Sequence, residues 1–191
     1  MGEHELNDGE ISRACRQNDP NAWRYLIRTY AALVYRVAIR MLRNKQDAED
    51  ASQEVFMRVH RSIESHDPTR PLAPWLSRIT YNVCLKRISK AGQTAKKEVA
   101  LYAHDAPEEG NENTPEYQLT RKQTANHVLK ALDRLSAQDR ALVAMRYTEG
   151  FTDTEIAEST HMPVGTVKTR LHRARGKLKK ILAPYIREAS A

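Results

Sequence analysis

A cluster of basic residues lies near the C-terminal end of the chain. Between Val164 and Ile181 the sequence has seven lysine or arginine residues and no acidic residue. At helical spacing, lysine, threonine, histidine and arginine side chains occupy one side of this segment. The other side is a narrow apolar arc of Val164, Val167, Leu171, Ala174 and Leu178. A basic face opposite an apolar arc suits the phosphates and base edges of nucleic acid, and the alternative is a solvated helix face.

The residues before this segment predict how it is positioned. Thr152 and Glu155 have the spacing of a capping box, which starts a short helix. The chain then turns at residues 160–163, and a last helix is expected over 164–183. Together they predict a helix-turn-helix whose last helix lies in a DNA major groove. We expect DNA contacts from Arg146, Thr166, Lys168, Thr169, His172, Arg173 and Arg175.

A second cluster has the opposite charge. In a helix over 47–63, Asp47, Asp50 and Glu54 fall on an arc that we expect to be exposed, with Gln53 and Met57. The core arc of the same helix is Ala48, Ala51, Val55, Val59 and Ile63. The helix dipole favours acids in the first turn but does not account for Glu54, which could instead pair with Arg58. The arc therefore predicts a protein-binding surface.

The remaining periodicity predicts an all-α fold of two small helical domains. Helices are expected over 21–43, 47–63 and 75–90, and they can share one core. Three prolines within residues 65–74 exclude a helix interior there. Residues 91–115 lack an apolar period and contain many turn formers, so we expect a flexible linker.

Helices are expected to resume after the linker. Thr114 is a suitable N-cap and Pro115 a suitable first residue for a helix from Glu116. Ser136 caps a further helix, which ends at Gly150.

Composition excludes several classes of protein. The 191 residues carry a net charge of +7, and no stretch has the length and apolarity of a membrane-spanning helix. The N-terminus has no apolar signal core, and the two cysteines lie far apart, so we expect a cytoplasmic protein without disulfides, metal, cofactor or membrane insertion. Catalytic motifs are absent from the sequence, so we do not expect an enzyme.

Three segments, in this order, are similar to one known family. Residues 47–56 (DAEDASQEVF), 74–82 (PWLSRITYN) and 163–175 (PVGTVKTRLHRAR) resemble an extracytoplasmic-function sigma factor of bacterial RNA polymerase. The resemblance implies a region 2 over 11–90 that binds the clamp helices of the β′ subunit and melts the minus-ten promoter element. After a linker over 91–115, it implies a region 4 over 116–185 that reads the minus-thirty-five element and contacts the β flap. One departure is Leu72-Ala-Pro74, where the family often has an aromatic residue.

The resemblance also implies roles for residues. Polymerase binding falls to Asp47, Asp50, Gln53, Glu54 and Met57. Minus-ten DNA binding falls to His66, Arg70, Arg78, Asn82, Lys86 and Arg87, with Asn82 suited to a base edge and the loop before the third helix to a pocket wall. Spacing assigns Trp75 to the core rather than to base stacking. An anti-sigma factor is an expected further partner.

Two other classes remain as alternatives. A stand-alone helix-turn-helix regulator would need a ligand pocket or a dimer stripe, and the first helices provide neither clearly. A small nuclease would need a metal held by Asp47, Glu49, Asp50 and Glu54, which have no histidine partner.

Overall fold

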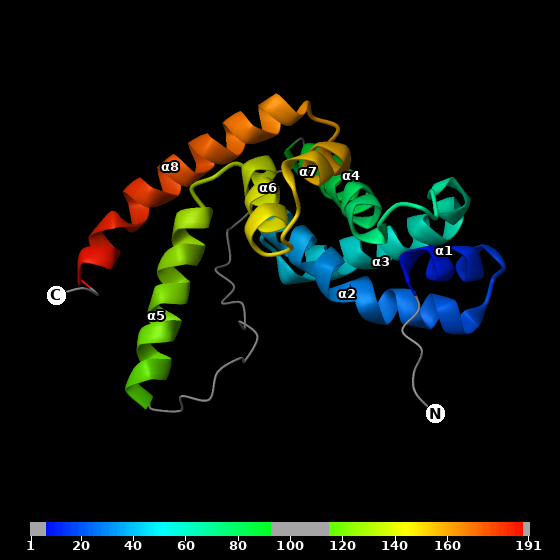
Figure 1. The fold of residues 1–191 in the computed structure, drawn as a ribbon. Helices are drawn as coiled ribbons and strands as arrows, with labels where there is room; N and C mark the ends of the chain where they lie inside the picture. The colour runs from blue at the N-terminus through cyan, green and yellow to red at the C-terminus, as the bar shows by residue number, and fades with distance from the viewer. Residues whose placement is uncertain (1–6, 93–114, 189–191) are drawn as a thin grey trace.

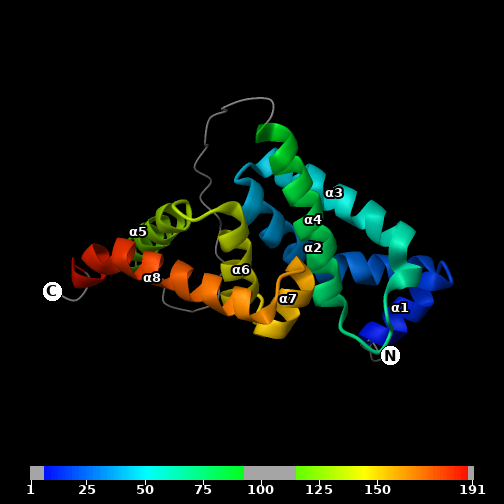
Figure 2. The same cartoon turned by 90° about the horizontal axis from the view of Figure 1, so that it is seen from above.

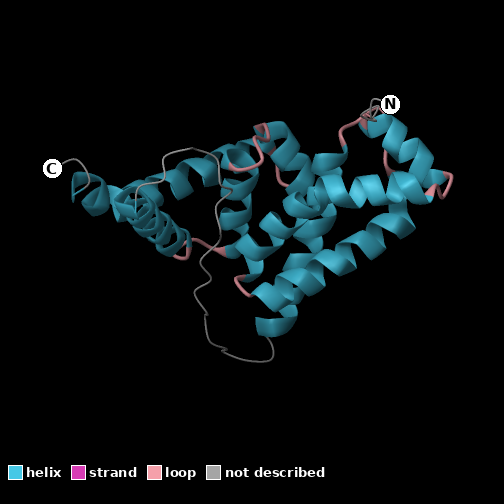
Figure 3. Ribbon diagram, turned by 90° about the horizontal axis from the view of Figure 1, so that it is seen from below, coloured by secondary structure: helices cyan, strands magenta, loops and turns pink. Residues whose placement is uncertain are grey.

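A computed structural model describes residues 7–92 and 115–188, and every regular element within these ranges is a helix (Figures 1 and 3). The all-α prediction is therefore confirmed. The predicted linker falls almost entirely on residues 93–114, outside the described residues, as does Thr114. The helices are α1 (Asp8–Arg16), α2 (Pro20–Leu42), α3 (Lys45–Ser62), the 3-10 turn η1 (Ile63–Ser65), α4 (Leu72–Gly92), α5 (Pro115–Leu132), α6 (Ala137–Tyr147), α7 (Asp153–Thr160) and α8 (Val164–Glu188).

The helix α1 was not predicted, because the expected first domain began at residue 11. Asn7 and Glu10 form a capping box, in which each side chain accepts a hydrogen bond from the other residue's backbone N–H. Ile11 and Cys15, one turn apart, are buried. The spacing of Asn7 and Glu10 was the sequence signal that could have revealed this helix.

Three predicted helix boundaries were wrong by three residues or more. Helix α6 ends at Tyr147 rather than at Gly150, which lies in the following turn with a φ of 71°. Helix α4 begins at Leu72 rather than residue 75, so Pro74 lies in its first turn. Proline is tolerated there because the first backbone N–H groups of a helix have no partner within the helix. Helix α8 continues to Glu188, with Pro184 inside it, beyond the expected end at residue 183.

The first group of helices packs around α2. Helices α3 and α4 both contact it, and α1 covers its N-terminal part (Figure 2). The predicted core arc of α3 is buried, with Ala48, Ala51, Val55 and Val59 fully inaccessible and Ile63 4% exposed. Helix α3 thus buries this arc against α2 and α4, and the opposite face of the helix is exposed to solvent.

The second group is formed by α5 to α8. Helices α6 and α7 lie between α8 and the first group, while α5 and the C-terminal half of α8 extend away from it (Figure 1). The apolar arc of α8 supplies this core through Val167, Leu171 and Ala174, which are buried as predicted.

A buried arginine of α6 joins the two groups. Arg140 is 8% exposed, and its guanidinium donates hydrogen bonds to the backbone oxygens of Arg40 (2.5 Å) and Met41 (3.0 Å). These carbonyls belong to the last turn of α2, where backbone acceptors lack helical partners. Nearby, Arg36 of α2 donates two hydrogen bonds of 2.7 Å to Glu149.

Candidate nucleic-acid and protein-binding surfaces

The helix-turn-helix is formed by α7 and α8. Thr152 and Glu155 form the predicted capping box at the start of α7. The helix ends at Thr160, and the next residue, His161, has a left-handed φ of 56° that turns the chain toward α8. Because Val167 and Leu171 bury one side of α8 against α6 and α7, the other side faces solvent.

The predicted DNA-binding residues of α8 are all exposed. They are Thr166, Lys168, Thr169, His172, Arg173 and Arg175. A groove of about 590 Å³ lies beside His172 and Arg173, and its lining also includes Lys177 and Lys180. Arg146 is also exposed, but its guanidinium donates to the backbone oxygen of Phe151 at 2.8 Å, in the turn before α7.

Arg170 is the basic residue of α8 that holds the helix in place. Its guanidinium donates to Asp139 at 2.7 Å and to Gln138 at 2.9 Å, both near the start of α6. Partial burial by itself would raise the pKa of Asp139, but hydrogen bonds from Ser136 and Arg170 outweigh it and lower that pKa. The carboxylate is therefore charged at neutral pH, and this pair fixes α8 on α6.

Three predicted minus-ten residues form an exposed stripe along α4. Arg78, Asn82 and Lys86 follow one another at intervals of four residues, and all three are exposed. Such a spacing puts them one above the other on one helix face. We call these three residues the α4 stripe.

The structure places the other minus-ten residues differently. His66, expected among the minus-ten DNA-binding residues, is only 2% exposed, and its Nδ1 lies 2.9 Å from the Ser12 hydroxyl, so its ring is buried rather than at the surface. Arg87 is half-buried and bonded to Glu54 rather than directed to solvent. Arg70 is exposed and forms an ion pair with Glu158 of α7. Trp75 packs on the core as expected, and the centroid of its ring lies 5.0 Å from the centroid of the His66 ring.

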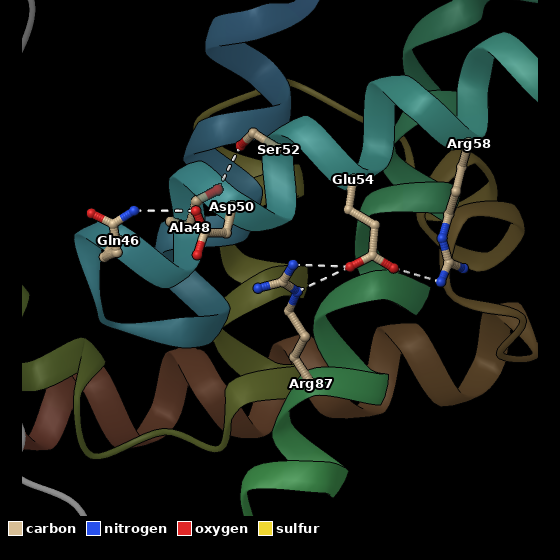
Figure 4. Close-up of polar contacts among 7 residues, drawn as sticks. All are labelled: Gln46, Ala48, Asp50, Ser52, Glu54, Arg58 and Arg87. Carbon is tan, nitrogen blue, oxygen red and sulfur yellow. Dashed lines mark hydrogen bonds and ion pairs between the residues drawn. The ribbon is translucent and has the colours of Figure 1, made fainter.

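The acidic patch comprises Asp47, Asp50, Gln53, Glu54 and Met57 of α3. Four of its members are exposed, and Met57 is 54% exposed, which is high for a large apolar side chain. Asp50 accepts a hydrogen bond from Gln46 at 3.1 Å on the helix surface (Figure 4). These side chains thus present carboxylates, an amide and an apolar side chain to solvent.

Glu54 differs from the rest of the acidic patch, and the expectation that it is exposed was wrong. Its side chain is 29% exposed and bonds Arg58 at 2.6 Å and Arg87 at 2.9 Å (Figure 4). Partial burial by itself would raise the pKa of Glu54, but the hydrogen bonds from Arg87 and Arg58 outweigh it and lower that pKa. The pairing with Arg58 was foreseen, whereas the bond from α4 was not.

A metal-binding cluster and a membrane-spanning helix are both absent from the described part of the chain. Residues 7–92 and 115–188 contain no group of three or more histidine, cysteine or carboxylate side chains that could hold a metal ion. Within the same residues, no helix is both long enough and apolar enough to cross a membrane.

The chain matches known proteins over both groups of helices. Residues 26–94 match the Sigma-70 region 2 family and residues 126–178 match the Sigma-70, region 4 family. The ECF RNA polymerase sigma factor SigW of Bacillus subtilis is 32% identical over 176 residues, which cover 87% of this chain and 92% of that protein. The ECF RNA polymerase sigma factor SigE of Mycolicibacterium smegmatis is 33% identical over 88% of this chain and 65% of that protein.

A solved structure has the same fold. The sigma factor RpoE from Bartonella quintana, in complex with the anti-sigma factor NepR, matches 84% of this chain and 96% of its own, with a TM-score of 0.69 and 22% identity. The helix-turn-helix, the helical first group and these matches agree on one class of transcription-initiation protein. The chain belongs to the ECF sigma factors of RNA polymerase, which are not enzymes.

Proposed function

We propose that three surfaces of this sigma factor divide its work between polymerase and promoter DNA. Residues 11–90 form the unit that binds core polymerase and the minus-ten element, and residues 116–185 form the unit that reads the minus-thirty-five element. The observation that carries this proposal is the separation of charge: a carboxylate patch on α3, and basic surfaces on α4 and α8, in one basic chain.

The acidic patch is the proposed polymerase surface, with the β′ clamp helices as its partner. Asp47, Asp50 and Gln53 supply hydrogen-bond acceptors, and Met57 supplies apolar area that a partner can bury. Interfaces are enriched in methionine at their cores, and opposite charges speed association. Glu54 contributes by joining α3 to α4 through Arg87.

The α4 stripe is the proposed minus-ten surface. Arg78 and Lys86 can hold two phosphates of one strand, and Asn82 between them has an amide donor and an acceptor for a base edge. Arg70 lies in the loop before α4 and joins this surface when it leaves Glu158. His66 acts from beneath the loop rather than on DNA.

The exposed face of α8 is the proposed minus-thirty-five surface. Lys168, Thr169, His172 and Arg173 lie where a recognition helix meets base edges. The phosphates of the DNA backbone would be bound by Thr166, Arg175 and Arg146. The same unit would contact the β flap, the whole chain would work in the cytoplasm, and an anti-sigma factor would be its regulatory partner.

Promoter opening tests the role of the α4 stripe. Asn82→Ala should slow opening of the minus-ten region while closed-complex affinity through α8 stays near that of wild type. Permanganate footprinting with core polymerase measures opening, and Thr29→Ala, at an exposed position of α2, is the control. Normal opening by Asn82→Ala would remove this residue from the proposal. Palindrome binding without polymerase would instead favour the stand-alone regulator.

A further inference from the structure

We propose that α1 holds the shape of the α3–α4 loop (residues 66–71), and that Asp8, Gly9, Ser12 and Arg16 are positioning residues for capture of the minus-ten strand. This inference rests on the function proposed above for α4 and the loop before it. Helix α1 lies outside residues 26–94, which match region 2, so the match does not account for it.

Asp8 connects α1 to the start of α4. One carboxylate oxygen of Asp8 accepts the backbone N–H of Leu72, the first residue of α4, at 2.8 Å. The other oxygen accepts the hydroxyl of Tyr30 on α2. A carboxylate at a helix N-terminus satisfies a backbone donor that has no helical partner and also interacts favourably with the helix dipole. Asp8 therefore fixes where the loop ends and α4 begins.

Gly9 lets the loop backbone lie against α1. A Cβ at this position would be 2.5 Å from the backbone oxygen of Pro68, closer than carbon and oxygen can approach. The nearest atom belongs to the backbone, so a methyl group here can be accommodated only if the loop and α1 move apart. Because Gly9 has no side chain, α1 and the loop can lie this close together.

Ser12 and Arg16 hold the loop through His66. The Ser12 hydroxyl is buried 2.9 Å from His66 Nδ1, and Arg16 donates to the backbone oxygen of His66. The His66 ring also packs near Trp75, in the first turn of α4, with the two ring centroids 5.0 Å apart. Burial lowers the pKa of His66, against the raising effect of Asp8 and the Pro71 carbonyl, so the ring is neutral at neutral pH. His66 therefore works as an uncharged link between α1 and the loop.

The other side of the loop is exposed, and Arg70 on that side pairs with Glu158 of α7. Asp67, Thr69, Arg70 and Pro71 are exposed, and Asp67 accepts both the backbone N–H and the hydroxyl of Thr69. With its inner side bound to α1 at several points, the loop presents this outer side in one shape at the start of α4. An unstacked base needs a preformed wall, because a wall that orders on binding costs conformational entropy.

The test compares a substitution in α1 with a control substitution in α2, in holoenzyme assembled from the full chain and core polymerase. The probe is a promoter selected from a random library by wild-type holoenzyme. Gly9→Ala should slow minus-ten opening about tenfold, within the range expected for losing capture of one base, with closed-complex affinity unchanged. Thr29→Ala, at an exposed position of α2 outside the three proposed surfaces, should behave as wild type. Since alanine is the better helix former, local helix stability alone predicts no loss in either variant.

A second pair keeps the inference testable if Gly9→Ala does not fold. Asp8→Ala should slow opening, and Asp8→Asn should restore most of it, since an asparagine oxygen can still accept the Leu72 N–H. Wild-type opening by Gly9→Ala, or equal rates for the two Asp8 variants, would overturn the role of α1. If Asn82→Ala is also without effect, the proposed minus-ten surface fails as well; if only Asn82→Ala slows opening, α1 alone is excluded.

Discussion

Reversing one charge in the acidic patch should separate polymerase binding from folding. In Asp50→Arg, an exposed carboxylate of α3 becomes a cation, and the hydrogen bond lost to Gln46 is a surface one of 3.1 Å. Surface changes of this kind usually alter stability by no more than about 0.5 kcal/mol. The fold should therefore persist, and any loss of polymerase binding reports on the surface itself.

The expected size of that loss follows from the position of Asp50. Close interfacial charge pairs contribute about 1.5–7 kcal/mol, and Asp50, exposed in the free chain, belongs at the lower end. A cost of about 1.5–3 kcal/mol corresponds to a rise in Kd of roughly 10- to 150-fold. The control is Glu49→Arg. This substitution makes the same change of charge on the same helix, at a position about 100° around the helix axis from Asp50.

The assay is titration of labelled protein with core polymerase, alongside thermal unfolding of each variant. We expect weaker binding for Asp50→Arg, near wild-type binding for Glu49→Arg, and similar unfolding temperatures for both. Equal polymerase affinity of the two variants would show that net charge, and not the acidic patch, governs binding.

Three further predictions concern residues elsewhere in the structure. Arg140→Met should lower the free energy of unfolding by about 2–4 kcal/mol in chemical denaturation, because buried carbonyls lose a charged donor, while Arg134→Met at an exposed site should be neutral. Glu54→Gln should lower the free energy of unfolding by about 1 kcal/mol at pH 7. Because folding lowers the pKa of Glu54, the difference in free energy of unfolding between wild type and Glu54→Gln is largest above the ordinary pKa of a glutamate. The difference disappears as the pH falls through the pKa of Glu54 in the folded chain. Arg173→Ala should cost roughly 1–3 kcal/mol on a matched minus-thirty-five duplex and less on a scrambled one, whereas Lys179→Ala should weaken both and reduce the salt slope by about one in binding titrations.

Features set by local helix geometry could be predicted from the sequence. In α3 and α8 the 3.6-residue period was enough to place Val55 and Val167 in the core and Asp50 and Arg173 on the surface. The capping box at Thr152 was equally predictable, because both partners lie within one turn.

Features that depend on distant partners could not be predicted in the same way. Glu54 shares the exposed arc by period, yet it is half-buried because Arg87, 33 positions along the chain, approaches it from α4. His66 looked like a loop residue facing DNA, and it is buried because α1 supplies Ser12, 54 positions earlier. No local pattern encodes how α1 packs on the loop.

Run-off transcription by core polymerase, with and without this chain, tests the central claim most directly. The template is a promoter selected from a random library by the assembled holoenzyme. We predict transcripts from one start site only when the chain is present, with protection of both promoter elements and a melted minus-ten region. Transcripts that are no more specific than those of core polymerase alone would contradict the account. So would protection of DNA by the chain alone that stays the same when core polymerase is added.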